Sequence, residues 1–419
     1  TLGAFRAHTS TDEADFFRGA VGAWRWKGID IMAFASYRKV DARLSNASSD
    51  TVTTLLQSGL HRTLSEIEAR RTMGNLTAGW HWGINQKHWG LATDGVWTHF
   101  NKYVSPVKRW YNANYFRGQT ARSLSASYYI EFSKLYVQGD VSTDRNWHIA
   151  TIHRLLYVPV RCLRLGLQYR QFSPRYVSLY GKALQQGSRV SNEQGMLCNL
   201  YWLVGRSMEM TGYVDVFRFL KPTYLSQKPN AKGMEFMYQM AYRLSNSWRL
   251  QLRYQLKTRQ YTLKENDRLG LEYRTTQKLR LASLWSYPKY EVNTQLDGCY
   301  SHHQTGKNSL GWMLSSRAAW KASSRFHLKA FASLFFTDDT ESRLYAYEPQ
   351  MPHNNAFPSY AYHGMCGVVM GSFQAFKFLT LSLRFSSTHY FNRNYISSRL
   401  DEISSSWKND CSVQVKWRI

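Results

Sequence analysis

The last eleven residues of the chain, 409–419, read NDCSVQVKWRI and indicate which fold the chain adopts. Counted in twos, they separate into an apolar set (Cys411, Val413, Val415, Trp417 and Ile419) and a polar set (Ser412, Gln414, Lys416 and Arg418). Because successive side chains of a strand point to opposite faces, the stretch predicts a strand with one apolar and one basic face. Such a strand fits a transmembrane barrel and a soluble sandwich equally well, so repetition along the chain must decide.

The same alternation recurs in the stretches 163–170, 248–257 and 268–274. Over these four strands the polar face has 17 positions, of which nine are Lys or Arg and one is acidic, and the apolar face carries no charge. A half-buried soluble sheet would mix both signs on its wet face. Strands of about ten residues with an uncharged face opposite a polar one are typical of transmembrane barrels. We therefore predict an all-β fold, a large antiparallel transmembrane β-barrel.

The pattern predicts nineteen strands along the chain, and a barrel of about 18–22 strands is expected because residues 2–8 fit one more. The predicted strands are 19–27, 29–38, 74–85, 88–102, 120–132, 134–142, 146–157, 163–172, 195–204, 208–218, 233–243, 247–258, 266–275, 278–287, 309–320, 325–337, 361–374, 378–389 and 409–419.

The connections between these strands sort by parity into short and long ones. The short set is 27–28, 86–87, 133, 158–162, 205–207, 244–246, 276–277, 321–324 and 375–377. The opposite set includes the long connections 39–73, 103–119, 173–194, 219–232, 288–308, 338–360 and 390–408. Bacterial barrels have short periplasmic turns and longer outer loops, so the long set is predicted to be extracellular and the protein to reside in the bacterial outer membrane.

We expect residues 1–419 to form a single barrel domain. The odd strand count favours further strands and an N-terminal periplasmic part upstream of Thr1. An open sheet edge in lipid would leave unpaired N–H and C=O groups, each costing several kcal/mol by a rough estimate. The first and last strands are therefore expected to pair with each other or with a strand from elsewhere.

The net charge indicates the class of partner, and the short apolar runs exclude a helical membrane protein. The net charge is 54 − 28 = +26, which points to an anionic partner such as nucleic acid, lipid phosphates or an acidic cargo. The apolar runs are too short for a spanning helix, which needs about 18 residues. The five cysteines are scattered without a CxxC pair, so they predict neither a disulfide framework nor a metal site.

One outer loop is predicted to contain a short helix at 61–70. Thr63 would be its N-cap and Glu66 the reciprocal partner in a capping box, with Leu64 and Ile67 forming an apolar stripe. A helix that lies across or into the barrel mouth explains these residues more simply than a ligand site.

Several short motifs resemble a family of large Bacteroidota proteins that carry helix-hairpin-helix repeats before a C-terminal outer-membrane barrel. The motifs are FFRGA at 16–20 after an acidic run, 37–41 with 59–63 and Glu66, Asn192-Glu193, 343–345 with 347–348, and 400–403. The resemblance runs from about residue 10 to the end. It implies an outer-membrane barrel, while the helix-hairpin-helix part and any duplex binding would lie outside this chain.

The acidic residues of the loops also suggest an enzyme, because barrel enzymes use carboxylates or a Ser/His pair at the rim. We instead expect these acids to pair with the abundant arginines and to pack loops inside the lumen. The residues expected in such loop or plug contacts are Glu13, Arg18, His61, Arg62, Glu66, Glu193, Arg343 and Glu348. The histidines show no HxH or HExxH spacing and nucleotide loops are absent from the sequence, so neither enzyme activity nor a metal or cofactor is predicted.

The basic face predicts the function, if that face lines a lumen. Its lumen-lining residues would be Arg164, Arg170, Arg249, Arg253, Lys257, Arg268, Arg274, Lys416 and Arg418. A positive conduit selects permeants by sign, so we predict a porin-like channel or translocation conduit for anionic solutes or polymers.

Two alternatives stay open beside the channel. One is a non-transporting structural or assembly subunit of a surface complex, and the other is a part of a DNA-binding or uptake system. The expected partners are outer-membrane lipids, an anionic solute or polymer, and other outer-membrane or periplasmic proteins. Nucleic acid is a weaker expectation, because the strands place aromatic and arginine side chains on opposite faces.

Overall fold

The structure is a computed structural model that describes residues 8, 14, 16–46, 49–265, 268–351, 354, 357–397 and 401–417. The chain divides into two compact units. Unit 1 comprises Thr1–Asn199, Val214–Met234 and Gln260–Leu271, and unit 2 comprises Leu200–Tyr213, Glu235–Arg259 and Glu272–Ile419.

Nearly all of the described secondary structure is β-strand. Unit 1 contains β1 (Gly19–Trp26), β2 (Ile29–Val40), β3 (Ala42–Leu44), β4 (Thr51–Leu55), α1 (Leu64–Glu68), β5 (Met73–Asn85), β6 (Trp89–Val104), β7 (Gly118–Phe132), β8 (Leu135–Asp144), β9 (Ile149–Val160) and β10 (Leu163–Phe172). Five strands have residues in both units, namely β11 (Glu193–Val204), β12 (Met208–Phe219), β13 (Ala231–Arg243), β14 (Trp248–Glu265) and β15 (Arg268–Ser286). Unit 2 contains β16 (Tyr290–His303), β17 (Ser309–Lys321), β18 (Phe326–Thr337), β19 (Leu344–Tyr345), β20 (Ser359–Tyr360), β21 (His363–Phe376), β22 (Leu379–Tyr390) and β23 (Trp407–Trp417).

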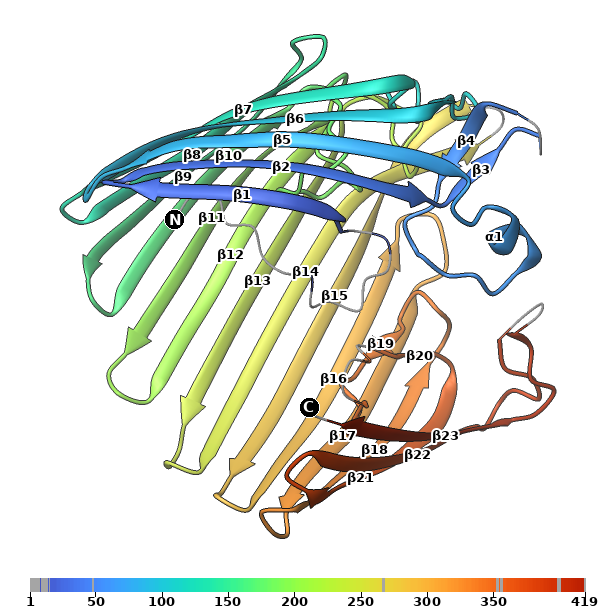
Figure 1. Ribbon diagram of the computed structural model, residues 1–419. Helices are drawn as coiled ribbons and strands as arrows, with labels where there is room; N and C mark the ends of the chain where they lie inside the picture. Colours follow the sequence, from blue (N-terminus) through green and yellow to red (C-terminus); the bar gives the residue numbers. More distant parts are fainter. Residues whose placement is uncertain are drawn as a thin grey trace. The chain divides into compact units, whose positions relative to one another are not determined.

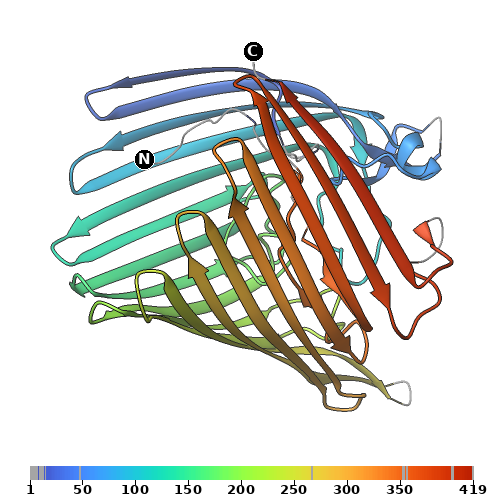
Figure 2. The same cartoon turned by 90° about the horizontal axis from the view of Figure 1, so that it is seen from below.

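In unit 1 the long strands pair with their neighbours in the chain. β2 pairs antiparallel with β1 and with β5, and from β5 to β10 each strand pairs antiparallel with the next. Both ribbon views show β5 to β10 side by side in sequence order (Figures 1 and 2). The short β3 and β4 form a hairpin in the loop that follows β2.

In unit 2 the pairing follows the same rule. β16 pairs with β15 and β17, β18 with β17 and β21, and β22 with β21 and β23, all antiparallel. The loop between β18 and β21 contributes β19 and β20, which pair only with each other. Consecutive hairpins of this kind form the meander that an up-and-down barrel requires.

The described residues contain nineteen long strands, the number that the alternation predicts. The number agrees because two errors compensate, since β15 was predicted as the two strands 266–275 and 278–287 and β16 was not predicted. The predicted turn at 276–277 lies inside β15, and most of the predicted loop 288–308 is strand β16. The actual turn is 287–289, which includes Pro288, and the actual loop is 304–308.

The connections still sort by parity after this correction. One set is short: 27–28, 86–88, 133–134, 161–162, 205–207, 244–247, 287–289, 322–325 and 377–378. The other set includes 41–72, 105–117, 173–192, 220–230, 338–362 and 391–406, together with the short 145–148 and 304–308. The β1–β2 turn places Lys27 and Gly28 at positive φ, 45° and 85°, as tight hairpins require.

The two faces of the strands differ as the sequence predicts. In β23, Val413, Val415 and Trp417 are exposed, whereas Gln414 and Lys416 between them are partly covered. Ile419 lies outside the described residues, as does Arg418. Strands elsewhere show the same pattern, with large apolar side chains on the exposed face. A continuous exposed apolar face of this kind is stable only when it contacts lipid.

The predicted loop helix is α1, and its cap is the predicted one. The Thr63 hydroxyl accepts a hydrogen bond from the Glu66 N–H, and the Glu66 carboxylate accepts one from the Thr63 N–H. The Arg62 N–H also donates to this carboxylate, over 2.8 Å, and lowers the pKa of Glu66. The capping box is therefore confirmed. In the part of the chain that the structure describes, no helix is long and apolar enough to span a membrane.

Candidate functional site

The polar face of the strands carries most of the predicted basic residues, and several have an acidic partner. Arg249 Nη2 lies 3.1 Å from Glu209, Lys257 Nζ lies 3.1 Å from Glu235, and Arg274 Nη2 lies 2.8 Å from Glu272. Arg253 acts electrostatically on Asp297. Of the remaining residues, Arg164 and Arg268 are exposed and Lys416 is half-buried.

Three of the acids on this polar face were not identified by the sequence analysis. Glu209, Glu235 and Asp297 belong to β12, β13 and β16, which are outside the four strands whose charges define the predicted basic face. In β12 the spacing offered a signal, because Glu209 and Asp215 are six residues apart and therefore share a face. The polar face therefore carries both basic and acidic side chains.

Arg170 is the centre of a buried charge cluster in unit 1. Its Nε donates to Glu193 over 2.6 Å, and its Nη1 and Nη2 donate to the two Asp215 oxygens over 2.8 and 3.0 Å. The side chains of Arg170 and Glu193 are fully buried. Gln186 completes the cluster. Its backbone N–H donates a hydrogen bond to Glu193, and its side-chain Nε2 donates one to Asp215.

The cluster fastens loop 173–192 to the polar face of the sheet, since Gln186 belongs to that loop. The loop also reaches β5, where the Asn75 amide donates to the Tyr180 hydroxyl over 3.0 Å and Thr77 Oγ1 lies 3.1 Å from the same hydroxyl. The Val177 N–H donates to Asp144 over 3.1 Å. A loop held at β5, β8, β11 and β12 is folded inward over the sheet.

A cavity of about 540 Å³ lies between this inward loop and the sheet. The wall is rich in hydroxyl and carboxyl groups from β6, β7 and β8, including Ser125, Asp94 and Asp140. Tyr176 and Tyr180 from the loop line the other side. The cavity can hold a small polar solute, which makes it the candidate passage or binding space of unit 1.

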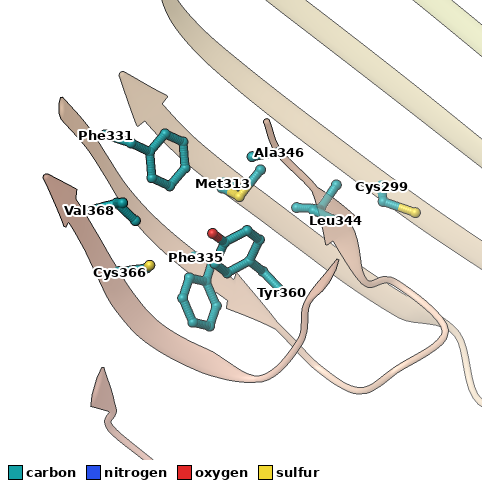
Figure 3. Close-up of a cluster of buried hydrophobic side chains, with 9 residues drawn as sticks. All are labelled: Cys299, Met313, Phe331, Phe335, Leu344, Ala346, Tyr360, Cys366 and Val368. Atoms are coloured by element: carbon teal, nitrogen blue, oxygen red, sulfur yellow. The ribbon is translucent and has the colours of Figure 1, made fainter. Parts of the chain in front are cut away.

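In unit 2 a second loop, 338–362, is packed against the polar face of the sheet by an apolar cluster. Leu344, Ala346 and Tyr360 of the loop contact strand residues that include Met313 and Phe335. Figure 3 shows these loop side chains grouped with strand side chains that include Met313, Phe335 and Val368. Burying this many apolar groups on a polar face indicates that the loop is a fixed part of the structure.

Glu348 provides the polar anchor of the same loop. It accepts a hydrogen bond from Arg384 Nη2 over 2.7 Å and another from the Tyr360 hydroxyl. Arg384 Nε also donates to the Pro349 carbonyl over 2.7 Å. Burial raises the pKa of the Tyr360 phenol, and the nearby Cys366 and Glu348 raise it further.

The other residues predicted in loop contacts are placed as follows. His61 Nε2 lies 2.8 Å from Asp41, and Arg62 Nη2 lies 3.4 Å from Glu66. Arg343 Nε donates to the Tyr345 hydroxyl over 3.0 Å, so Glu348 pairs with Arg384 and not with its neighbour in sequence. The guanidinium of Arg18 lies 5.8 Å from the ring centre of Phe16. Glu13 lies outside the described residues.

Within the described ranges there is no group of three or more His, Cys, Asp or Glu side chains arranged to hold a metal. The five cysteines are all free, and Cys299 and Cys366 are buried in the apolar cluster of loop 338–362. Glu193, Asp215 and Glu348 are held in ion pairs with arginines.

Comparison with known proteins identifies the fold. No family model matches the sequence, and no curated protein is similar to it. Among solved structures, FpvA of P. aeruginosa, bound to heterologous pyoverdines, is 9% identical with a TM-score of 0.53, covering 95% of this chain and 64% of FpvA. The siderophore receptor PirA from Acinetobacter baumannii is 7% identical with a TM-score of 0.48, covering 98% of this chain and 72% of PirA. The outer-membrane channel DcaP of Acinetobacter baumannii is 7% identical with a TM-score of 0.37, covering 83% of this chain and 98% of DcaP.

The likeness to FpvA extends over nearly the whole chain, and it agrees with the meander of long strands and with their exposed apolar face. This chain spans less than two thirds of the length of FpvA. The fold is that of a large antiparallel outer-membrane β-barrel with long extracellular loops, one of which contains a short helix. The predicted location in a bacterial outer membrane agrees with this fold.

Proposed function

We propose that the protein is a porin-like channel whose basic inner wall conducts anionic solutes or polymers. The observation that carries the proposal is the excess of cations on the polar face. Lys278, Lys329 and Lys416 lie on that face in unit 2, and none of them forms an ion pair with a described carboxylate. They add to the paired cations, so the local field is positive.

Positive side chains on the polar face of a sheet surrounded by low-dielectric lipid concentrate anions and repel cations. The pairs Arg249–Glu209 and Lys257–Glu235 reduce this field without cancelling it, because each pair is neutral and the remaining lysines are not. The carboxylates also hold the arginine side chains against the wall, which keeps the passage free of long mobile groups.

A second candidate is a non-transporting subunit of a surface complex. It is favoured by the two loops, 173–192 and 338–362, that are fixed on the polar face by buried ion pairs. Loops held this firmly would suit a closed interior whose outer surface binds a partner. Membership of the helix-hairpin-helix family and a role in DNA uptake remain predictions from the sequence.

Conductance in planar bilayers under a potassium chloride gradient tests the first candidate. The purified full chain is expected to conduct with a reversal potential of the anion-selective sign. Replacing Arg253 and Lys278 by Gln should lower the chloride-to-potassium permeability ratio. Lys228→Gln with Lys232→Gln removes the same net charge from loop 220–230 and from the opposite face of β13, and should leave the ratio unchanged.

Cation preference in the wild-type protein would contradict the basic-wall channel. Absence of conductance, together with a stoichiometric partner that co-purifies from gently solubilised membranes, would favour the assembly subunit instead.

A further inference from the structure

The cavity of about 540 Å³ in unit 1 lies between loop 173–192 and the polar faces of β6, β7 and β8 (Figure 1). Serine occupies three alternate positions on the polar face of β7, namely Ser123, Ser125 and Ser127, and all three line the cavity. Because these side chains are small, they leave open space between the strand and the loop. The sequence of β7 thus explains why a cavity forms at this place.

Polar groups from three strands meet in this space. Asp94 of β6 is paired with Ser125, and Ser125 is paired with Ser142 of β8, so these three side chains form one row on the same face. Ser127 and Asp140 are directly paired in the neighbouring row. Two carboxylates and three hydroxyl groups are therefore gathered on one part of the wall.

Much of the hydrogen-bonding capacity of this part of the wall is unused. The Ser125 and Ser127 hydroxyls have no hydrogen-bond partner among the residues that the structure describes. Asp94 and Asp140 each use Oδ1 in a hydrogen bond of 2.7 Å, and neither Oδ2 has a donor within the described ranges. These atoms can bind the hydroxyl groups of a solute, because a hydroxyl group donates to a carboxylate and both donates to and accepts from serine.

Another part of the wall is apolar. Phe172 and Tyr176 are buried together with Ala150, and Ala183 and Val190 of the loop pack against them. All five residues line the cavity. A solute that fits this space must therefore present an apolar surface as well as polar groups.

The charges that line the cavity balance. Asp94 and Asp140 are its carboxylates, and Arg154 and Lys182 are two cations. Arg122, the other charged residue in the lining, belongs to the opposite face of β7 from the serines. A net charge of either sign gains little from such a wall, in contrast to the basic wall of the proposed channel.

A neutral sugar meets these requirements, because it carries hydroxyl groups along the edges of its ring and apolar C–H groups on the faces. We propose that the cavity binds a neutral saccharide of one or two rings. Asp94 and Asp140 accept hydrogen bonds from its hydroxyl groups, Ser125 and Ser127 add further hydrogen bonds, and the apolar part of the wall around Tyr176 contacts a ring face.

The size and rigidity of the cavity suit this role. Its volume lies within the range of small-molecule sites, roughly 300–1,000 Å³. Hydrogen bonds at Tyr180 and Gln186 fix the loop on the sheet, so the cavity is formed before a solute enters and the entropy cost of binding is reduced. Binding does not require anion conduction, so its test is independent of the proposed channel.

The test uses the full chain in a polyoxyethylene detergent, because alkyl maltoside detergents carry a sugar headgroup that would compete. Titration calorimetry with glucose, galactose, maltose and cellobiose should show saturable binding of at least one sugar with a Kd of about 1 mM or lower. The affinity should be the same at about 0.1 M and about 1 M potassium chloride, because salt does not screen a neutral solute.

Two variants test the site itself. Asp140→Asn keeps the size of the side chain but removes the charged acceptor, and it should weaken binding at least about tenfold. Ser125→Phe fills the cavity and should abolish binding. Ala126→Phe is the matched control, since Ala126 is exposed on the opposite face of β7, and its affinity should equal that of the wild type.

The proposal is overturned if none of the four sugars binds, or if Asp140→Asn binds the sugar as well as the wild type while its heat-modifiable gel mobility shows an intact barrel. An affinity that falls at high salt would indicate a site for a charged solute and would also overturn it. Equal losses of binding in Ala126→Phe and Ser125→Phe would contradict the assigned position of the site.

Discussion

At the scale of single residues, the buried ion cluster raises the question of why a fully buried arginine is tolerated. Arg170 donates three hydrogen bonds to two carboxylates, and Gln186 donates to the same carboxylates from the inward loop. Desolvation of an ion is offset only when its partners satisfy it in this way. The cluster therefore links the position of loop 173–192 to the stability of the strands.

Replacing Arg170 by Met should lower the free energy of unfolding by about 3–5 kcal/mol, because Glu193 and Asp215 lose their buried cation. Urea-dependent folding into phospholipid vesicles, followed by tryptophan fluorescence, measures the loss. Arg249→Met serves as the control, since the Arg249–Glu209 pair is well exposed and should contribute about 0–1 kcal/mol. Equal losses in the two variants would show that burial of Arg170 has no special role.

The pH dependence of loop 338–362 should follow Asp339. Burial raises the pKa of this carboxyl, but hydrogen bonds from the Ser309 hydroxyl and the N–H groups of Glu341 and Ser342 bring the pKa below its ordinary value of 3.8. The stability that it contributes is complete above pH 3.8 and is lost as the pH falls through the lower folded value. The protection factors of the loop amides, which compare the observed with the intrinsic exchange rate, should therefore fall in acid relative to pH 7.

Asp339→Asn provides the reference for this measurement, because its side chain does not titrate. At each pH the intrinsic exchange rate is the same for both proteins. The ratio of their observed exchange rates therefore reports only the effect of the Asp339 carboxylate. The ratio of the exchange rate of Asp339→Asn to that of the wild type should differ most from unity at pH 7 and approach unity in acid. A ratio that is independent of pH would mean that Asp339 does not hold the loop.

At the scale of elements, the strands and the capped helix α1 were predictable because alternation and the capping box are local signals, whereas the partners of the inward loops were not. The apolar and polar sides of β10, β14 and β23 follow directly from residue order. β16 was missed although its stretch YEVNTQLDGCYSHH alternates, because Thr294 and Gly298 weaken its apolar face and Pro288 was not used as the turn signal. The inward loops depend on contacts between distant residues, such as Tyr180 with Asn75, that no local pattern records.

The two faces of β23 can be compared at adjacent positions. Val413→Arg places a charge on the exposed apolar face and should cost about 2–4 kcal/mol near the membrane midplane. Gln414→Arg places the same charge on the opposite face, where it should cost much less. Folding titrations into vesicles measure both variants. Equal costs would contradict a lipid contact at Val413.

At the scale of the whole molecule, the net charge of +26 can be interpreted only when it is divided between the apolar and the polar face of the strands. The apolar face of the strands carries few charges, so most charged side chains lie on the polar face, in turns and in loops. Acids on the same polar face neutralise part of the excess, as in the pairs Arg280–Asp297 and Arg384–Glu348. Composition alone predicts the sign of this field but takes no account of these ion pairs.

This division of charge predicts how the proposed channel responds to salt. Mobile ions screen fixed charges over about 10 Å at 0.1 M and about 3 Å at 1 M ionic strength. The chloride-to-potassium permeability ratio of the wild-type chain should therefore be high in dilute potassium chloride and approach the ratio of free-solution mobilities at about 1 M. Reversal potentials at a constant gradient and increasing total concentration measure the change. A steric passage would give a ratio independent of salt, so a flat response would remove the role assigned to Arg253, Lys278 and the other cations of the wall.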